Sequence, residues 1–371
     1  MRRNALRTPV AVITGFLGSG KTTLLNRLLQ RPEMAGAAVI INEFGEIGLD
    51  HLLIATPSEN TVLLSSGCLC CTVRGDLVET LADLYRKRRD GVVPAFDRVI
   101  VETTGLADPA PIIQTLVTDP ELAPLFTLDS VVTLVDAVNG AQQLDAHPES
   151  VKQAALADRV LITKTDIAAA AEVRALENRL ARMNPGAELH TVVRGEVEPA
   201  ALFGAGVSDA RAPAEKVKRW LRDAEFAHAE SEAAHHHHHG GHDVNRHDEH
   251  IRAFCVRLDT PVSGAGLEMW LNMLAALRGA KLLRVKGLLD VDGTPVVIHA
   301  VQTLIHEPVE LARWPDEDRR SRLVFITRDM AREEIEATLP MLTLRPPAGE
   351  RARTLDPETY AQFLAAAKSF R

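Results

Sequence analysis

The chain has 371 residues, which is long for a single compact core and favours two domains. Hydrophobic residues make up 46% of it and charged residues 25%, the composition of an ordinary globular protein. A net charge of -8 argues against a protein that binds nucleic acid. No hydrophobic run is long enough for a signal peptide or a membrane span, so we expect a cytoplasmic protein with no membrane partner.

Short runs of β-branched residues alternate with helical stretches through the first half of the chain. The runs span 10–14, 38–42, 61–64, 98–102, 131–135, 159–163 and 189–193. Alternation of this kind is typical of an α/β fold, in which helices cover both faces of a largely parallel sheet. We therefore predict one α/β domain over residues 1–205.

The second half divides into a polar stretch and a further domain. Residues 206–250 are rich in alanine and charged residues and end in a histidine tract from His235, so we predict a flexible linker. The tract either binds metal weakly or is simply solvated. Strands are predicted at 251–258, 281–291, 295–304 and 322–327, and helices at 264–278 and from 331. This pattern predicts a smaller α+β domain over residues 251–371, with a mixed or antiparallel sheet.

Two pairs of side chains in this second domain have simple interpretations. Arg284 and Lys286 lie two apart on one predicted strand and share a face, which we expect to be solvated; the alternative is a face that meets an acidic partner. Cys255 is interpreted as a core residue, and His299, which falls in an apolar strand, as a core or interface residue.

A phosphate-binding loop is predicted at residues 15–22, where Gly-Phe-Leu-Gly-Ser-Gly-Lys-Thr fits G-x-x-x-x-G-K-[ST] between a strand and a helix. Its glycines let consecutive backbone N–H groups surround phosphate oxygens. Lys21 is expected to reach the β and γ phosphates, and Thr22 to offer its hydroxyl to Mg²⁺. The residues predicted to contact the nucleotide here are Gly15, Gly18, Ser19, Gly20, Lys21, Thr22 and Thr23.

A carboxylate for the same magnesium ion is predicted at Glu102, which ends an apolar run and is followed three residues later by Gly105. Glu102 is expected to reach the ion or its water shell. Gly105 is expected to present its backbone N–H to the γ-phosphate and to act as the pivot of a switch. Together with Lys21 and Thr22, Glu102 completes the set that we predict to be catalytic.

The nucleotide base is predicted to be read by Thr163-Lys164-Thr165-Asp166, which resembles N-K-x-D with Thr in place of Asn. The Asp166 carboxylate can accept hydrogen bonds from both N1–H and the amino group of guanine. Adenine lacks this pair of donors and would leave the acceptor unpaired, which discriminates strongly. GTP is therefore favoured over ATP. The alternative is a P-loop kinase or ATPase, for which Asp166 would be incidental.

Cys68, Cys70 and Cys71 are crowded into four residues, which is poor geometry for disulfides and suits a metal site in a reducing compartment. Three thiolates leave a fourth position on the ion, for water, a partner's ligand or a carboxylate such as Glu43 or Glu46. Soft sulfur ligands favour zinc or a related late metal over magnesium. The alternative is three small buried side chains in a strand.

In this order, the motifs resemble those of the CobW-type metallochaperone GTPases. The similarity includes Asn-Glu-Phe-Gly-Glu at 42–46 and, in the second half, Leu-Arg-Val-Lys-Gly at 283–287. The resemblance implies a P-loop NTPase domain that hydrolyses GTP, holds a metal at the three cysteines and hands it to a client apoprotein under nucleotide control. It also implies that residues 42–46 belong to the first switch.

From these observations we expect a GTPase that uses GTP and Mg²⁺ and delivers Zn²⁺ to a client metalloprotein. Co²⁺, Ni²⁺ and Fe²⁺ are alternative cargoes, because members of such a family serve different clients. A homodimer is one assembly that the chain could form. The rival from another class is a metal buffer or sensor without hydrolysis, in which the nucleotide only tunes metal affinity. The sequence identifies neither a general base nor an arginine finger.

Overall fold

A computed structural model describes residues 7–42, 62–66, 73–207, 210–226, 228, 250–278 and 281–345. The chain forms two compact units. The described part of the first lies within 7–181 and 187–206, and that of the second within 182–186, 207–226, 228, 250–278 and 281–345.

The first unit is built on a seven-stranded sheet in the order β3-β2-β4-β1-β5-β6-β7. Every neighbouring pair of strands is parallel. The strands are β1 Thr8–Gly15, β2 Ala37–Asn42, β3 Val62–Ser66, β4 Arg98–Glu102, β5 Phe126–Asp136, β6 Arg159–Thr163 and β7 Glu188–Val192. The predicted α/β class is therefore confirmed.

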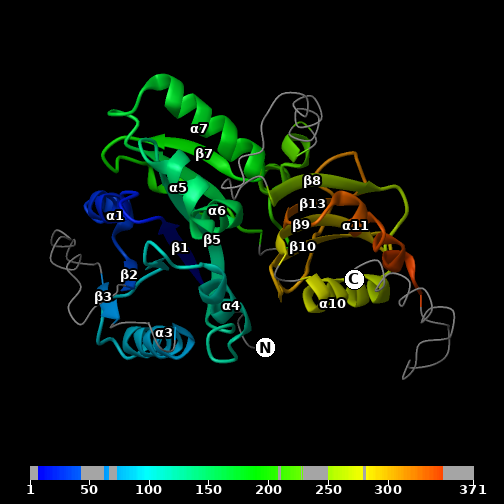
Figure 1. Ribbon diagram of the computed structural model, residues 1–371. Helices are drawn as coiled ribbons and strands as arrows, with labels where there is room; N and C mark the ends of the chain where they lie inside the picture. The colour runs from blue at the N-terminus through cyan, green and yellow to red at the C-terminus, as the bar shows by residue number, and fades with distance from the viewer. Residues whose placement is uncertain are drawn as a thin grey trace. The chain divides into compact units, whose positions relative to one another are not determined.

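Helices lie on both faces of this sheet (Figure 1). They are α1 Lys21–Leu28, α3 Val73–Arg89, α4 Ala110–Thr118, α5 Gly140–Ala146, α6 Pro148–Leu156 and α7 Ala170–Met183, with short 3-10 helices at Pro32–Met34 and Pro199–Ala201. One cluster of buried side chains joins α3 and α4 to the face that carries Val10 and Val99. A second joins α1 to the opposite face, which carries Ile13 and Leu134.

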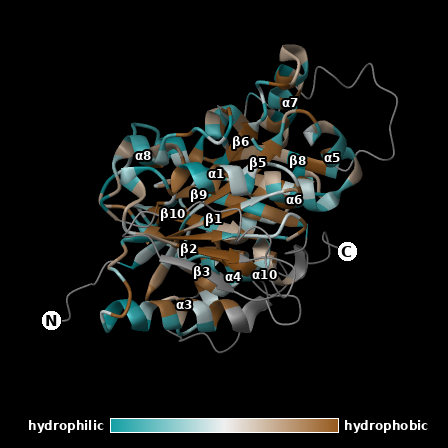
Figure 2. Cartoon of the chain, turned by 90° about the vertical axis from the view of Figure 1, so that its left-hand side faces the viewer, coloured by the Kyte–Doolittle hydropathy of each residue, from teal (hydrophilic) through white to brown (hydrophobic). Residues whose placement is uncertain are grey.

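The central strand β1 shows why the sequence adopts this architecture. Residues 10–13 read Val-Ala-Val-Ile, and all are buried because helices cover the strand from both sides. Strands buried on both faces read as continuous hydrophobic runs rather than alternating ones. Figure 2 shows β1 and β2 in the brown of hydrophobic residues, whereas α3 alternates between brown and teal along its length.

Strand β5 begins earlier than the predicted run 131–135. Its first residues pair with the start of β1, and the register shifts there, so that Val10 pairs with Leu128 but Ala11 pairs with Ser130. Two polar side chains of this part bond within the same unit. Ser130 Oγ donates to the carbonyl of Leu202 over 2.7 Å, and Asp129 Oδ2 accepts from the backbone N–H of Gly204 at 2.7 Å.

The second unit contains an antiparallel sheet in the order β11-β10-β9-β13-β8, with β12 paired to β10. The strands are β8 Ile251–Leu258, β9 Leu282–Val291, β10 Thr294–Val301, β11 Leu304–Ile305, β12 Val309–Glu310 and β13 Ser321–Arg328. The predicted strand 295–304 is thus two strands, joined by a turn at Gln302, whose φ is 52°.

One face of this sheet packs against α10 Gly264–Arg278 through a core that includes Trp270 and Phe325. The Trp270 indole N–H donates to Thr338 Oγ1 at 2.7 Å, so the polar atom of this large core side chain also has a hydrogen-bond partner. The helix predicted from residue 331 is the short α11 Arg332–Glu336, followed by a 3-10 helix at Leu339–Thr343.

The span 206–250, expected to be a linker, is not a linker throughout. Residues Ala214–Leu221 form helix α8, whose side chains Val217, Trp220 and Leu221 are buried. Their spacing of three and four residues is that of an amphipathic helix, a pattern that the alanine-rich, charged composition concealed. The histidines from His235 to His247 lie outside the described residues.

Candidate nucleotide and metal site

The predicted phosphate loop connects β1 to α1 at the carboxyl end of the central strand. Gly20 directly precedes α1 with a φ of 97°, a conformation that glycine adopts without steric cost. No side chain of the described residues caps this end of α1, so its first backbone N–H groups are available to an anion. The Lys21 ammonium group donates to the carbonyl oxygens of Gly15 at 2.8 Å and Phe16 at 3.2 Å.

Ser19 supplies independent support for a ligand in this loop. Its hydroxyl is fully buried and has no hydrogen-bond partner in the described part of the chain. A buried polar group without a partner is costly, and such groups in folded proteins call for a specific explanation. A phosphate oxygen fits this loop, because it accepts from hydroxyl and backbone N–H donors alike.

Glu102 ends β4, the strand beside β1, and lies opposite Ile13 in the parallel register. The side chain is buried at the carboxyl end of the sheet, the same end from which the phosphate loop leaves β1. Thr22 is the second residue of α1. Hydroxyl and carboxylate oxygens are the ligand types that Mg²⁺ takes beside substrate phosphates, so the two residues fit the ion chemically.

The segment after β4 packs tightly on the phosphate loop. A Cβ added to Gly105 would lie 2.7 Å from the backbone nitrogen of Leu17 and 2.8 Å from its Cα, so only glycine fits there. Two residues earlier in the chain, just after β4, Thr103 Oγ1 donates to Thr14 Oγ1, in β1, at 2.8 Å. The structure therefore brings the predicted switch glycine next to the loop that it was expected to sense.

The predicted base-reading loop begins at the end of β6 and is tied to the phosphate loop. Thr163 Oγ1 donates to the backbone carbonyl of Ser19 at 2.8 Å. Lys164 has a φ of 59°, and its ammonium group bonds Asp136 Oδ2 at 2.6 Å. Thr163 thus ends β6, and Lys164 and Asp166 follow it, at the same end of the sheet as the phosphate loop.

Asp136 is a site residue that the sequence analysis missed. Burial would raise the pKa of its carboxyl group, but hydrogen bonds from Lys164, from Asn139 Nδ2 at 2.9 Å and from the backbone N–H of Val138 at 2.8 Å outweigh it, and the pKa is lowered. Asp136 therefore holds Lys164 in place as an ionised carboxylate. The available signal was an acid at the end of an apolar strand.

Arg194 is a second residue that was missed. It follows β7 with a φ of 50°, and its Nε lies 3.6 Å from Asp166 Oδ2. Both side chains are accessible, with 79% and 29% of their surfaces exposed, so the ion pair is weak and a ligand can displace it. The carboxylate predicted to read guanine is thus accessible and faces a cation.

The thiol site lies outside the described residues, as do Cys68, Cys70, Cys71, Glu43 and Glu46. The structure describes the two strands that lead to these segments. Asn42, at the end of β2, pairs with Ser66, at the end of β3. The segment that contains both glutamates and the segment that contains the three cysteines therefore leave the sheet from adjacent positions. No group of three or more metal-binding side chains occurs within the described ranges.

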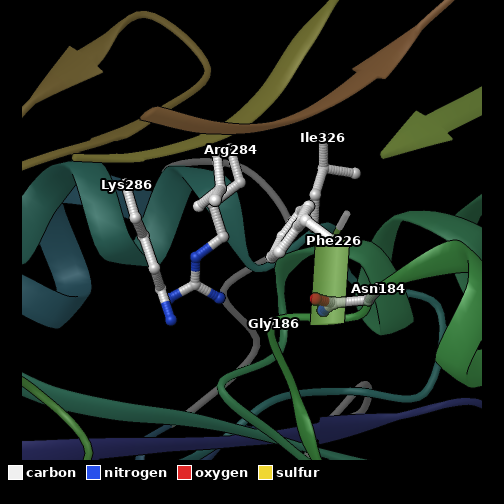
Figure 3. Close-up of a pocket in the computed structure, with 7 residues that line it drawn as sticks. Asn184, Gly186, Phe226, Arg284, Lys286 and Ile326 are labelled. Atoms are coloured by element: carbon white, nitrogen blue, oxygen red, sulfur yellow. The ribbon is translucent and has the colours of Figure 1, made fainter. Parts of the chain in front are cut away.

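The second unit contains a small pocket, and its lining corrects the interpretation of Arg284 and Lys286. Both side chains are buried, not solvated, and they extend from β9 beside Phe226 and Asn184 (Figure 3). The Lys286 ammonium group donates to the carbonyl of Trp220, in α8, at 2.9 Å and lies over its indole ring. These side chains fill the pocket and leave no room for a bound molecule.

His299 and His306 lie on the same sheet with their rings stacked 4.3 Å apart. Burial, followed by the nearby charges of His306, Arg284 and Lys286, holds the pKa of His299 well below its ordinary value. His299 is therefore neutral at pH 7.

Cys255 is a buried free thiol, as expected of a core residue. Within the described ranges, no helix combines the length and hydrophobicity needed to cross a bilayer.

Comparisons with known proteins agree with this geometry. The family model described as CobW/HypB/UreG, nucleotide-binding domain, matches residues 9–191, and the cobalamin synthesis protein cobW C-terminal domain matches residues 251–342. The chain is 35% identical to zinc chaperone YjiA of Escherichia coli (strain K12), with 89% of this chain and 97% of that protein covered. It is 30% identical to zinc chaperone CobW of Sinorhizobium sp, with 92% and 99% covered.

A solved structure gives the same result at the level of the fold. The crystal structure of Zn(II)-bound YjiA GTPase from E. coli matches with a TM-score of 0.66 and 31% identity, covering 91% of this chain and 99% of that one. Both family models and the coverage of these relatives extend across the two units of the chain.

Proposed function

Because this chain belongs to the CobW/HypB/UreG family of P-loop GTPases, we propose that it binds zinc at Cys68, Cys70 and Cys71 and transfers it to a client apoprotein under nucleotide control. The chain is a GTPase, and the proposal concerns what this activity serves. It is supported most directly by the pairing of Asn42 with Ser66, from which the glutamate and thiol segments continue at adjacent positions.

In the proposed site, Lys21 leaves the carbonyls of Gly15 and Phe16 and stabilises negative charge on the β and γ phosphates. The backbone N–H groups at the start of α1 and the buried hydroxyl of Ser19 hold the remaining phosphate oxygens. Thr22 and Glu102 would hold Mg²⁺, which supplies charge neutralisation between the phosphates. Gly18, Gly20 and Thr23 are the other residues of this loop region that we propose to contact the nucleotide.

Base selection is assigned to the loop after β6. Asp166 accepts hydrogen bonds from guanine N1–H and the amino group once the weak pair with Arg194 is displaced. Lys164 is held by Asp136, and Thr163 fixes the loop against Ser19. The bond from Thr163 to Ser19 thus fixes the distance between the loop that reads the base and the loop that binds the phosphates.

The metal half of the proposal starts from ligand chemistry. Three thiolates select a soft ion and leave one coordination position open, which suits a site that must release its cargo. Zinc is the proposed cargo, in agreement with the zinc chaperones to which the chain is similar. Glu43 or Glu46 supplies the fourth ligand. A γ-phosphate that reorders the segment after Asn42 would then change the geometry around the ion.

The remaining parts of the proposal concern organisation. A GTPase domain over residues 1–205 is joined through 206–250, which includes α8, to a domain over 251–371 that contributes to recognition of the client. The histidine tract from His235 raises the local concentration of metal near the thiols.

The test is a zinc titration of the reduced protein against a chromophoric chelator, with a non-hydrolysable GTP analogue, with GDP and without nucleotide. A triple Cys68, Cys70, Cys71 to Ser variant is the test variant, and Cys255→Ser, which changes a buried thiol of the second unit, is the matched control. We expect one tight zinc site that the triple variant loses and the control keeps, with an affinity that differs between nucleotides. Equal zinc affinity in all nucleotide states would refute nucleotide control.

A further inference from the structure

Helix α6 holds the segment that follows β4 at two points. The Gln153 side-chain amide donates to the backbone carbonyl of Ala107 at 2.9 Å and to that of Gly105 at 3.3 Å. The neighbouring Lys152 forms an ion pair with Asp108 at 3.0 Å. The helix thus fixes residues 105–108, the stretch that begins with the glycine packed on the phosphate loop.

Gln153 is itself held rigidly. The residue is 1% exposed, and its backbone carbonyl accepts a hydrogen bond from Thr133 Oγ1, in β5, at 2.7 Å. A buried amide anchored to the central sheet can transmit a displacement of a few tenths of an ångström, because the close-packed interior around it has no space to absorb it.

The amide oxygen of Gln153 supplies the second observation. Gln153 Oε1 is buried and has no hydrogen-bond partner within the described residues. If Gln153 served packing alone, the fold would be more stable with this oxygen also hydrogen-bonded. The unsatisfied oxygen therefore calls for a specific explanation. This unused acceptor lies on the side chain whose donors hold Gly105 and Ala107, so it is available to an N–H of that segment if the segment rearranges.

We propose that Gln153 is a positioning residue for GTP hydrolysis, which holds Gly105 where its backbone N–H can meet the γ-phosphate. The role follows from the chain of contacts from Thr133 through Gln153 to Gly105, and from Gly105 to Leu17 in the phosphate loop. Gln153 does not touch the nucleotide. It acts on the part of the site that distinguishes a triphosphate from a diphosphate, and this inference rests on the nucleotide half of the proposed function.

The test compares the affinities for a non-hydrolysable GTP analogue and for GDP in wild type and in Gln153→Leu, which keeps the bulk and removes the donors. We expect the affinity for the analogue to fall about tenfold, because the bond that holds Gly105 is lost together with the bond to Ala107, and the affinity for GDP to stay within about twofold. The turnover number for GTP should fall with the analogue affinity. Gln153→Glu places carboxylate oxygens against the two carbonyl oxygens. It should therefore lower the affinity for the analogue at least as much as Gln153→Leu does.

Ser130→Ala is the matched control. It also removes a buried hydrogen bond from a side chain to a backbone carbonyl, here from Ser130, in β5, to Leu202. It should lower the melting temperature and leave the ratio of analogue to GDP affinity unchanged. Lys152→Met, at a partly exposed pair, keeps the test usable if the Gln153 variants do not fold, and should lower the ratio about threefold.

The inference is overturned if the Gln153 and Lys152 variants fold and keep the wild-type ratio. Failure of wild type itself to bind guanine nucleotides would instead overturn the proposed function. The two failures are therefore distinguishable within one set of titrations.

Discussion

The side-chain hydroxyl of Thr163 donates a hydrogen bond to the backbone carbonyl oxygen of Ser19 over 2.8 Å, joining the loop after β6 to the phosphate loop. Removing this bond in Thr163→Val should loosen the base end of the site relative to the phosphate end. We expect the affinities for GTP and GDP to fall together, each by about tenfold. Titration with fluorescent nucleotides measures both, and Thr163→Ser, which keeps the hydroxyl, is the control. A change confined to GTP would contradict this account.

Asp166→Asn tests how the base is read. The substitution replaces one acceptor oxygen by a donor amide, so it cannot accept both guanine donors, but it can pair with a base that carries a carbonyl in place of the amino group. Guanine nucleotide affinity should fall by about a hundredfold, and xanthine nucleotides should bind better than guanine ones. Competition binding measures the preference. Glu177→Gln, which removes a charge from α7, should keep the wild-type preference.

The carboxylate of Asp136 should make the first unit sensitive to acid. Its pKa is lowered in the folded state, so its contribution to stability is complete above the unfolded value of about 3.9 and is lost as the pH falls through the folded value. Asp136→Asn should reduce the free energy of unfolding by about 1–3 kcal/mol at pH 7 and by less below about pH 4. Urea unfolding at several pH values checks this. A difference that grows in acid would have the wrong sign.

An ion pair in the second unit offers a test of stability away from the nucleotide. Arg322, which is buried in β13, is held by both carboxylate oxygens of Asp316 at 2.9 and 3.0 Å. Asp316→Ala leaves the buried guanidinium without this partner and should cost about 3–5 kcal/mol. Denaturant unfolding measures the loss. Guanine nucleotide affinity serves as the control and should not change, because both residues belong to the second unit.

The sequence predicted those parts of the fold that local pattern determines. Strands β4, β6 and β8 begin and end at the predicted residues, because each is a short run of mostly apolar residues that ends at a turn or a polar stretch. The start of β5, the turn after Val301 and helix α8 were missed. The first and the last depend on tertiary contacts: β5 is extended by pairing with β1, and α8 is ordered by burial of Trp220.

The site was predictable to a similar extent. The positions of Lys21, Glu102 and Gly105 followed from motifs placed at the carboxyl ends of strands, where the structure puts them. Asp136 and Arg194 were missed because their roles come from contacts with residues on neighbouring strands, which spacing does not reveal. The predicted roles of Cys68, Cys70 and Cys71 stay predictions, because these residues lie outside the described part of the chain.

Arg284 and Lys286 illustrate a different limit. The alternation along β9 placed them correctly on one face, but it does not say what covers that face. The carbonyl and the indole ring of Trp220, in α8, receive the Lys286 ammonium group, so a long cationic side chain is accommodated in the interior.

The order of the strands also determines when the phosphate loop can form during synthesis. Strand β1, which leads into the loop, lies between β4 and β5, so its pairing partners begin at Arg98 and Phe126, far along the chain. Contacts between residues that are distant in sequence form late, because the intervening chain must first be made and then closed into a loop. The loop between β1 and α1 can therefore take its shape only after the strand that ends at Asp136 has been made.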